Sequence, residues 1–493
     1  MKTSILPALS CSRYSLSGSL SGSLSGSLSG FAHRTAVAGG VLAALLAAVP
    51  ASAHDGDLKL RDRQRPVRGP IWREADQGDG GVAGGGFTSS GVVLKSWFPL
   101  NTFATGVQNG NSCWGWVSSA GREYAIMGLS NGTAFVDITD PGAAVIKSFQ
   151  PGVNSLWRDV RTHSRYCYAA SEGGAGIQVF DISQLDATGT TTLVRTVNTP
   201  SGTSAATHTL AIDNLSGYLY RAGGGGNGLR FYSLADPSNP TYVGAWTPFY
   251  VHEAQVKTYT SGPYAGKQIA FCFSGLNNGW ASPAVRIVDV TDKLNPVLLS
   301  TTTYPGARYC HQGWLDEESR YLYINDELDE GNTVTVTTTI VMDVSNLMTP
   351  VVMGTFTNGN TAVGHNIYVK GNKVYEANYR SGIRIFDIGV DRLNPPEIAW
   401  FDTYPTDDSA NFNGLWNIWP YFPSGTIIGS DIERGLFVWR EVVRGDINAD
   451  GFVNAADLGA LLAAWGSAGG AADLNGDGTV GAQDLTVLLG AWN

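Results

Sequence analysis

Short hydrophobic runs with a small or polar residue in phase recur along the middle of this chain. Most copies lead into a turn such as Asp140-Pro141 or Asn295-Pro296. The clear copies are 135–138, 179–182, 288–290, 342–344 and 386–388, and degenerate copies stand at 231–234 and 437–439. Their marker positions are 137, 181, 233, 289, 343, 387 and 439, so the spacing is nearly regular. A period of about 50 residues in a β-rich chain predicts repeated sheet units, of which a propeller blade is the leading interpretation.

Seven such units lie between Trp114 and Arg440. Each opens with an aromatic or histidine strand start, continues through a second strand and closes with the hydrophobic-Asp-hydrophobic strand. The openings are Trp114, Trp157, His208, His252, His311, His365 and Trp416, and the second strands are 123–127, 166–170, 218–221, 268–273, 321–324, 373–377 and 426–429. The seventh unit lacks a fourth strand, which residues 92–100 can supply to close a ring without exposed edges. We therefore predict an all-β fold, a seven-bladed β-propeller over residues 92–440, with six or eight blades as the alternatives.

Residues 445–493 carry the clearest chemical pattern. Two loops, 446–457 and 473–484, alternate oxygen-bearing side chains and place Gly451 and Gly478 at the sixth position, where an EF-hand loop turns sharply. Calcium is a hard cation that takes six to eight oxygen ligands. The predicted ligands are Asp446, Asn448, Asp450, Asn454 and Asp457 in the first loop and Asp473, Asn475, Asp477 and Asp484 in the second, with the backbone carbonyls of Phe452 and Thr479 at position seven.

A helix is predicted behind each calcium loop. Leu458, Leu461, Leu462 and Trp465 share one helical face, and Leu485, Leu488, Leu489 and Trp492 repeat that face behind the second loop. A solvated Asp/Asn/Gly turn would explain one such loop far better than two in phase with matching helices. We therefore predict a small α-helical, EF-hand-like module that binds two calcium ions and needs them to fold.

Residues 1–53 have the features of an export signal. Lys2, Arg13 and Arg34 make a positive leader, residues 36–49 are apolar, and Ala51-Ser52-Ala53 fits an A-x-A cleavage site. The apolar run is interrupted by glycine and proline and is short for a membrane anchor. We expect an exported protein, extracellular or at the cell surface, with the periplasm as an alternative. Residues 54–91, charged and then glycine-rich, predict a flexible lead-in.

Charge and hydropathy argue against two classes of partner, nucleic acid and a membrane that the chain would cross. The net charge of −10 and the lack of a basic stripe argue against nucleic acid, and no segment after the leader could cross a bilayer. Four cysteines remain after the leader: Cys113, Cys167, Cys272 and Cys310. They allow three pairings, and none has C-x-x-C spacing, so the alternatives are one or two disulfides or buried free thiols.

Four histidines share one repeat phase, which in a propeller is the innermost strand. His208, His252, His311 and His365 could therefore converge near the central channel with Glu253, Arg158 and Asp159. One hypothesis is a metal or acid/base site there. The alternative, which the equivalence with tryptophan in other blades favours, is that each imidazole packs its own blade. The acidic clusters Asp326-Glu327, Asp329-Glu330 and Asp431 with Glu433 are expected in loops of the top face, where a further calcium or sugar site is an alternative.

Two regions resemble known families. Residues 92–440 resemble the choice-of-anchor B proteins with LVIVD-type repeats, through motifs that begin at Trp114, Gly121, Phe135, Trp157, Cys310, Asn325, Ala377, Phe401 and Ser430. That resemblance implies a secreted β-propeller of unassigned activity with an exchangeable C-terminal anchor. Residues 445–493 resemble a type I dockerin, which implies calcium binding and a cohesin partner, with recognition positions at Ala455-Ala456 and Ala482-Gln483.

These observations favour a recognition or scaffold protein over an enzyme. We expect an exported propeller attached to the cell surface, or to an extracellular complex, through its calcium-binding module, with an extracellular polymer as a candidate ligand. One alternative is an extracellular hydrolase or metal-dependent enzyme that uses the histidine-lined channel. Another is a cohesin-docked component of a polysaccharide-degrading complex.

Overall fold

The computed structural model describes residues 58–76, 86–200, 203–224, 228–275, 283–448 and 452–492. The predicted signal peptide, 1–53, and the predicted calcium ligand Asp450 lie outside the described residues. Among the described residues, no helix combines the length and the apolar composition that crossing a bilayer requires.

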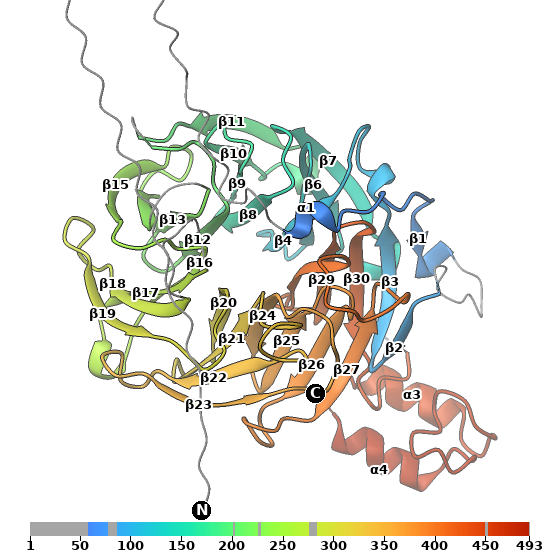
Figure 1. Ribbon diagram of the computed structural model, residues 1–493. Helices are drawn as coiled ribbons and strands as arrows, with labels where there is room; N and C mark the ends of the chain where they lie inside the picture. Colours follow the sequence, from blue (N-terminus) through green and yellow to red (C-terminus); the bar gives the residue numbers. More distant parts are fainter. Residues whose placement is uncertain are drawn as a thin grey trace, which may run out of the picture. The chain divides into compact units, whose positions relative to one another are not determined.

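The described residues form seven antiparallel sheets arranged around a central axis (Figure 1). Blades one to four are β4 (Gly110–Val117) to β7 (Val145–Pro151), β8 (Arg158–His163) to β11 (Thr192–Val197), β12 (Thr209–Asp213) to β15 (Thr241–Trp246), and β16 (Glu253–Thr258) to β19 (Val297–Thr302). Blade five is β20 (Cys310–Leu315) to β23 (Val351–Phe356). Blade six contains β24 (Asn366–Lys370) to β27 (Glu397–Asp402), and blade seven contains β28 (Leu415–Trp419) to β30 (Gly435–Glu441). The predicted seven-bladed β-propeller is confirmed.

A strand from the N-terminal part of the chain completes the seventh blade. Strand β3 (Val92–Phe98) pairs antiparallel with β30, so the last sheet is built from both ends of the propeller. The fourth strand expected from residues 92–100 is therefore present. It removes the exposed edge that β30 would otherwise offer to another chain.

Much of the expected flexible lead-in is part of the propeller, so that prediction is wrong for the described residues before β3. Strand β1 (Trp72–Arg73) pairs with β3, and β2 (Thr88–Ser90) pairs with β27. Val67 N donates to the carbonyl of Glu433 at 2.8 Å, and Asn413 Nδ2 donates to the carbonyl of Asp62 at 2.7 Å. The charged and then glycine-rich composition suggested a flexible linker, but these hydrogen bonds are made mainly by the backbone, which composition does not reveal.

The recurring Asp phrase lies on the third strand of each blade, not on the strand that closes it. An outer fourth strand follows, and its exposed positions, as in β11, weaken the hydrophobic pattern that would have predicted it. The carboxylate accepts the backbone N–H two residues later: Asp181 from Ser183 at 2.9 Å, Asp343 from Ser345 at 2.8 Å and Asp387 from Gly389 at 2.9 Å. The phrase is an architectural turn device that leads into the outer strand.

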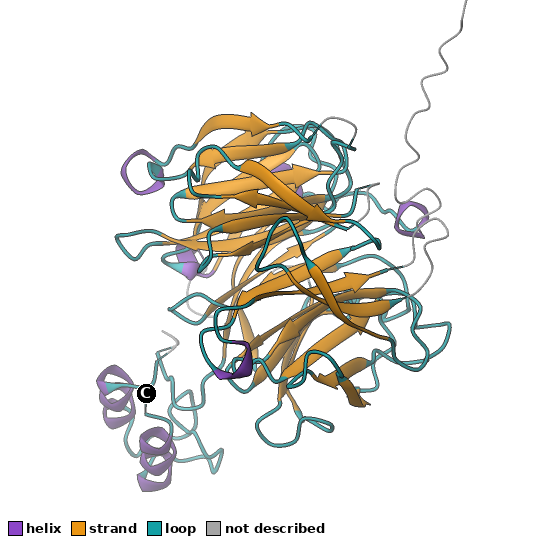
Figure 2. Cartoon of the chain, turned by 90° about the vertical axis from the view of Figure 1, so that its left-hand side faces the viewer, coloured by secondary structure: helices purple, strands orange, loops and turns teal. Residues whose placement is uncertain are grey.

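The innermost strands of neighbouring blades contact one another around the whole ring. Figure 2 shows the blades from the side. Each blade repeats the same inner-to-outer order, so the seven inner strands run in the same direction along the axis. Their first residues therefore gather at one mouth of the central channel and their last residues at the other. Apolar clusters fill the spaces between adjacent blades.

The four cysteines are buried free thiols, which matches the free-thiol alternative.

The strand that closes the ring generates a test of stability. Leu94 of β3 is 6% exposed and lies in a cluster with Ile385 of blade six and Trp439 of blade seven. Replacing it with alanine (Leu94→Ala) should lower the free energy of unfolding by about 2–5 kcal/mol, because a cavity opens between two blades. Denaturant unfolding measures this. Leu294→Ala, at a leucine that is 79% exposed, should change it by less than about 0.5 kcal/mol. Equal effects would contradict the closure by β3.

Candidate functional site

Four histidine rings lie side by side at the mouth where the inner strands begin. His208 and His252 directly precede β12 and β16, His365 precedes β24, and His311 is the second residue of β20. The ring centroids of successive residues in the order His208, His252, His311, His365 are 4.1, 4.6 and 4.2 Å apart. None of the four residues is more than 4% exposed. The shared repeat phase thus brings them together, as the strand geometry requires.

Hydrogen bonds at Nδ1 orient three of these rings. His208 Nδ1 lies 2.6 Å from Glu172 Oε1, and His365 Nδ1 lies 2.6 Å from the carbonyl of Trp416. Carbonyl oxygens only accept, so His365 donates from Nδ1, and in its neutral form Nε2 carries the lone pair. His252 Nδ1 lies 2.8 Å from the Tyr309 hydroxyl. Such second contacts are typical of histidines whose other nitrogen binds a metal ion.

Glu327 completes the histidine cluster, and sequence reasoning did not identify it as a channel residue. It follows β21 (Tyr321–Asp326) and is 2% exposed. Its Oε1 accepts from the Tyr379 hydroxyl at 2.6 Å and lies 3.3 Å from His365 Nε2, while Oε2 lies 3.7 Å from His311 Nε2. The only sequence signal was its place in an acidic cluster after a second strand.

Lys59 of α1 (Leu58–Arg61) reaches into the same cluster. Its Nζ lies 2.7 Å from Glu327 Oε1 and 5.2 Å from the centre of the Trp416 ring, and the residue is 4% exposed. Burial lowers the pKa of His311 well below its usual range, and the charges of His365, Lys59 and His208 lower it further. His311 is therefore a neutral imidazole with a lone pair at neutral pH.

The acidic clusters expected in loops of the top face are buried. Asp326, Glu327, Asp329, Glu330, Asp431 and Glu433 are each at most 4% exposed. Asp326 holds the chain together locally: it accepts from the backbone N–H groups of Arg308 and Tyr309, both at 2.7 Å. Burial raises the pKa of Asp329 to about 7. The expected exposed position of these clusters is therefore not observed, because all six side chains are packed between strands and loops.

A second buried network lies deeper in the channel. Arg161 in β8 bridges Asp159, with Nη1 to Oδ1 at 2.5 Å, and Glu253, with Nη2 to Oε1 at 3.3 Å. Its guanidinium also stacks 4.2 Å from the Trp114 ring centre. Burial raises the pKa of Glu253 to about 8, against the attraction of Arg161. Arg158 also lines the small cavity, and its Nε donates to the carbonyl of Leu129 at 2.9 Å.

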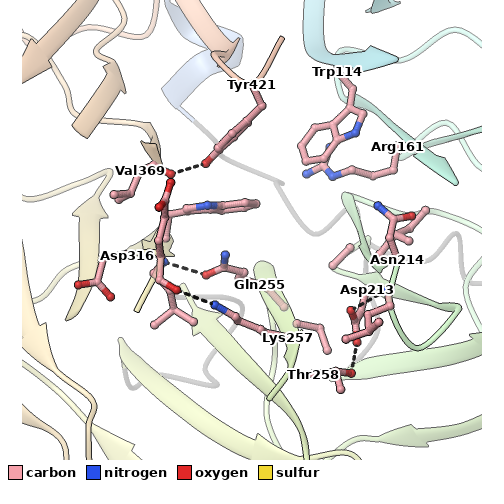
Figure 3. A pocket seen from close by; sticks show the side chains of 18 of the residues that line it. Trp114, Arg161, Asp213, Asn214, Gln255, Lys257, Thr258, Asp316, Val369 and Tyr421 are labelled. Atoms are coloured by element: carbon pink, nitrogen blue, oxygen red, sulfur yellow. Dashed lines mark hydrogen bonds between the residues drawn. The ribbon is translucent and has the colours of Figure 1, made fainter. Parts of the chain in front are cut away.

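The described residues enclose a small and a larger cavity along the channel. The smaller, about 20 Å³, is lined by histidines 208, 311 and 365 and by the Asp159–Arg161–Glu253 network. The larger, about 540 Å³, lies at the mouth where the inner strands end. Its wall combines Trp114, Trp314, Trp419 and Tyr421 with polar groups that include Asp213, Asn214, Gln255 and Lys257 (Figure 3). It could take a ligand with both apolar faces and hydrogen-bonding groups.

The described carboxylates of the calcium loops turn inward. Asp473 accepts from Gly476 N and Gly478 N, both at 2.9 Å, so both of its oxygens face the loop. Gly476 and Gly478 have φ of 74° and 89°, which residues with a side chain rarely adopt. Asp484 accepts from Leu474 N, Asn475 N and Gly481 N, and Asp457 makes the equivalent contacts in the first loop. This inward set of oxygens fits a hard cation such as calcium.

The helices behind the calcium loops are shorter than predicted. Helix α3 spans Ala455–Ala463 and α4 spans Ala482–Gly490, so Trp465 and Trp492 lie outside them. Only one leucine of each predicted face is fully buried, Leu461 and Leu488. Leu462, Trp465, Leu489 and Trp492 are 54, 47, 54 and 45% exposed. The repeated face therefore divides into a small core and an exposed apolar set.

Comparison with known proteins identifies the C-terminal module and adds little on the propeller. The dockerin type I domain family matches residues 444–490, so the chain carries a type I dockerin, a module that binds calcium and cohesin partners. No curated protein matches. Similar structures include the β-propeller domain of Cps50 (Swd1) from Myceliophteria thermophila, with 11% identity, TM-score 0.46 and coverage of 68% of this chain and 96% of that one. Hydrazine synthase from Kuenenia stuttgartiensis has 11% identity, TM-score 0.46 and coverage of 67 and 94%.

The buried carboxyl of Glu253 predicts a pH dependence of stability. The folded protein holds this proton up to a pKa of about 8, whereas the ordinary value is 4.5, so its contribution to stability falls as pH rises between those values. Glu253→Gln keeps the shape without the charge and should flatten that part of the profile, making the variant more stable relative to the parent above pH 8. Thermal unfolding across pH measures this. Glu317→Gln, at an exposed glutamate, should leave the profile unchanged.

Proposed function

We propose that this protein is an exported β-propeller of the choice-of-anchor B type, held on a cohesin-bearing extracellular complex by its dockerin. The observation that carries this proposal is the in-phase pair of loops and helices in residues 444–490. In each loop the twelfth-position aspartate binds its own loop backbone, and one calcium ion per loop would neutralise the clustered carboxylates. The leader in residues 1–53 supports export.

The exposed apolar set Leu462, Trp465, Leu489 and Trp492 is the cohesin-facing surface in this proposal. Leu489 and Trp492 stand behind the second loop as Leu462 and Trp465 stand behind the first. Exposed tryptophans are costly in water and are enriched at the centres of protein interfaces. The positions Ala455-Ala456 and Ala482-Gln483, at the first turns of α3 and α4, are the second candidate contact set.

Calcium removal should abolish attachment. In the full chain, Asp473→Ala should remove one of two calcium ions measured by calorimetry and weaken capture by immobilised cohesin at least about tenfold, because the second loop then lacks its first ligand. EGTA should abolish capture. The matched control is Asp292→Ala, at an exposed propeller aspartate that also accepts a backbone N–H, from Leu294 at 2.9 Å. Calcium-independent capture would count against the proposal.

The large cavity supports a second function, recognition of an extracellular carbohydrate polymer. Partly exposed rings of Trp314, Trp419 and Tyr421 offer flat apolar surfaces for the C–H faces of sugar rings. Gln255 and Lys257 line the same cavity and can bond hydroxyl groups (Figure 3). A propeller that binds a polysaccharide and is joined to a dockerin would hold the cohesin-bearing complex close to that polysaccharide.

Loss of aromatic surface should weaken such binding. Trp314→Ala should reduce oligosaccharide affinity about tenfold or more in calorimetric titration with cello-, xylo- and chito-oligosaccharides, because the stacking surface is lost. Trp400→Ala, a tryptophan on outer strand β27, is the control and should leave affinity unchanged. If none of these sugars binds the parent chain, carbohydrate recognition by this cavity is refuted.

A further inference from the structure

The histidine cluster is arranged as a metal centre of a different kind from the calcium loops. Ligand atoms of His252, His311 and Glu327 all lie within 4.8 Å of one another, and all three residues are buried. Two imidazole nitrogens and a carboxylate oxygen form a donor set that suits zinc, iron or copper better than calcium, which prefers oxygen. A fourth position can be completed by water or by a neighbouring ring.

The groups around His252, His311 and Glu327 support metal binding by these three side chains. The Tyr309 hydroxyl holds His252 at Nδ1, as neighbouring hydrogen-bonding groups hold ligating histidines. His311 Nε2 lies 3.7 Å from Glu327 Oε2, so this nitrogen and the carboxylate face each other in the proposed site. A cavity of about 20 Å³, with room for one water molecule, adjoins the cluster at His311.

Lys59 supplies the positive charge in the present arrangement. Its ammonium is 2.7 Å from Glu327 Oε1 and arrives on a segment that lies outside the ring of blades. The ammonium would repel a divalent cation bound to Glu327 at short range. The ion and Lys59 would therefore each weaken the other's interaction with the carboxylate. Helix α1 has only four residues, and its displacement would leave the propeller sheets intact.

We propose that His252, His311 and Glu327 form a buried site for a divalent transition-metal ion, and that Lys59 competes with the ion for Glu327. The inner-strand geometry supplies the ligands, and the N-terminal segment sets the affinity. The site is independent of the dockerin and of the large cavity, which lies at the other end of the inner strands.

The test is a titration of the full chain, stripped with EDTA and resaturated with calcium so that the dockerin loops are filled. Co²⁺ is the probe because its absorption spectrum reports coordination by imidazole, and Zn²⁺ competition gives the affinity. Lys59→Ala should tighten Co²⁺ binding about tenfold or more by removing a nearby like charge. His311→Ala and Glu327→Gln should weaken it about tenfold or more, because each removes a ligand.

Matched variants separate metal binding from folding. Lys95→Ala removes another buried lysine, paired with Glu74 at 2.9 Å, and should leave Co²⁺ affinity unchanged. Lys59→Met/Glu327→Gln removes both charges of the ion pair together, so the protein should stay folded by circular dichroism yet bind Co²⁺ about tenfold or more weakly than Lys59→Ala does. If the Lys59→Ala variant is folded and still binds no Co²⁺, the proposed site is wrong. If the parent chain binds Co²⁺ but Lys59→Ala does not tighten that binding, the proposed competition by Lys59 is wrong.

Discussion

The pairing of β3 with β30 is the interaction on which the rest of the molecule depends. A ring of sheets has no edges only when its last blade is completed, and here the completing strand comes from the N-terminal side of the chain. That closure brings the beginning of the propeller against its end. It also holds the preceding segment, through β1, on the outer side of β3. Lys59 lies on the segment that precedes β1 and reaches the histidine cluster through its pair with Glu327.

The common direction of the inner strands divides the channel into two chemical environments. Strand starts carry histidines 208, 252, 311 and 365, and strand ends carry aromatic and polar side chains around the large cavity. Between them, Arg161 reaches both environments, since it lines each cavity. Buried charge in the channel is balanced by short ion pairs, which is the condition for keeping so many carboxylates out of water.

The dockerin module follows different rules from the propeller. Its core has five fully or almost fully buried apolar residues, too few to stabilise a fold of this size by burial alone. The loops compensate by directing carboxylates at backbone N–H groups and, in the proposed state, at calcium. Stability of the propeller thus depends on strand pairing and packing between blades, whereas that of the module depends on its loops.

Local patterns in the sequence determined the blade number, the strand from residues 92–100 and the dockerin, because each depends on spacing along the chain. The Asp phrase at nearly regular intervals indicated the blades, and oxygen-bearing side chains at alternate loop positions indicated the dockerin. The phase of the histidines likewise indicated that they would meet. Tertiary structure alone decided that Glu327 and Lys59 join them, since one follows β21 and the other lies far away near the N-terminus. It also decided that the acidic clusters are buried and that residues 58–76 pack on the propeller. Contacts between residues so distant in sequence leave no periodic signal, and only the closed ring brings them together.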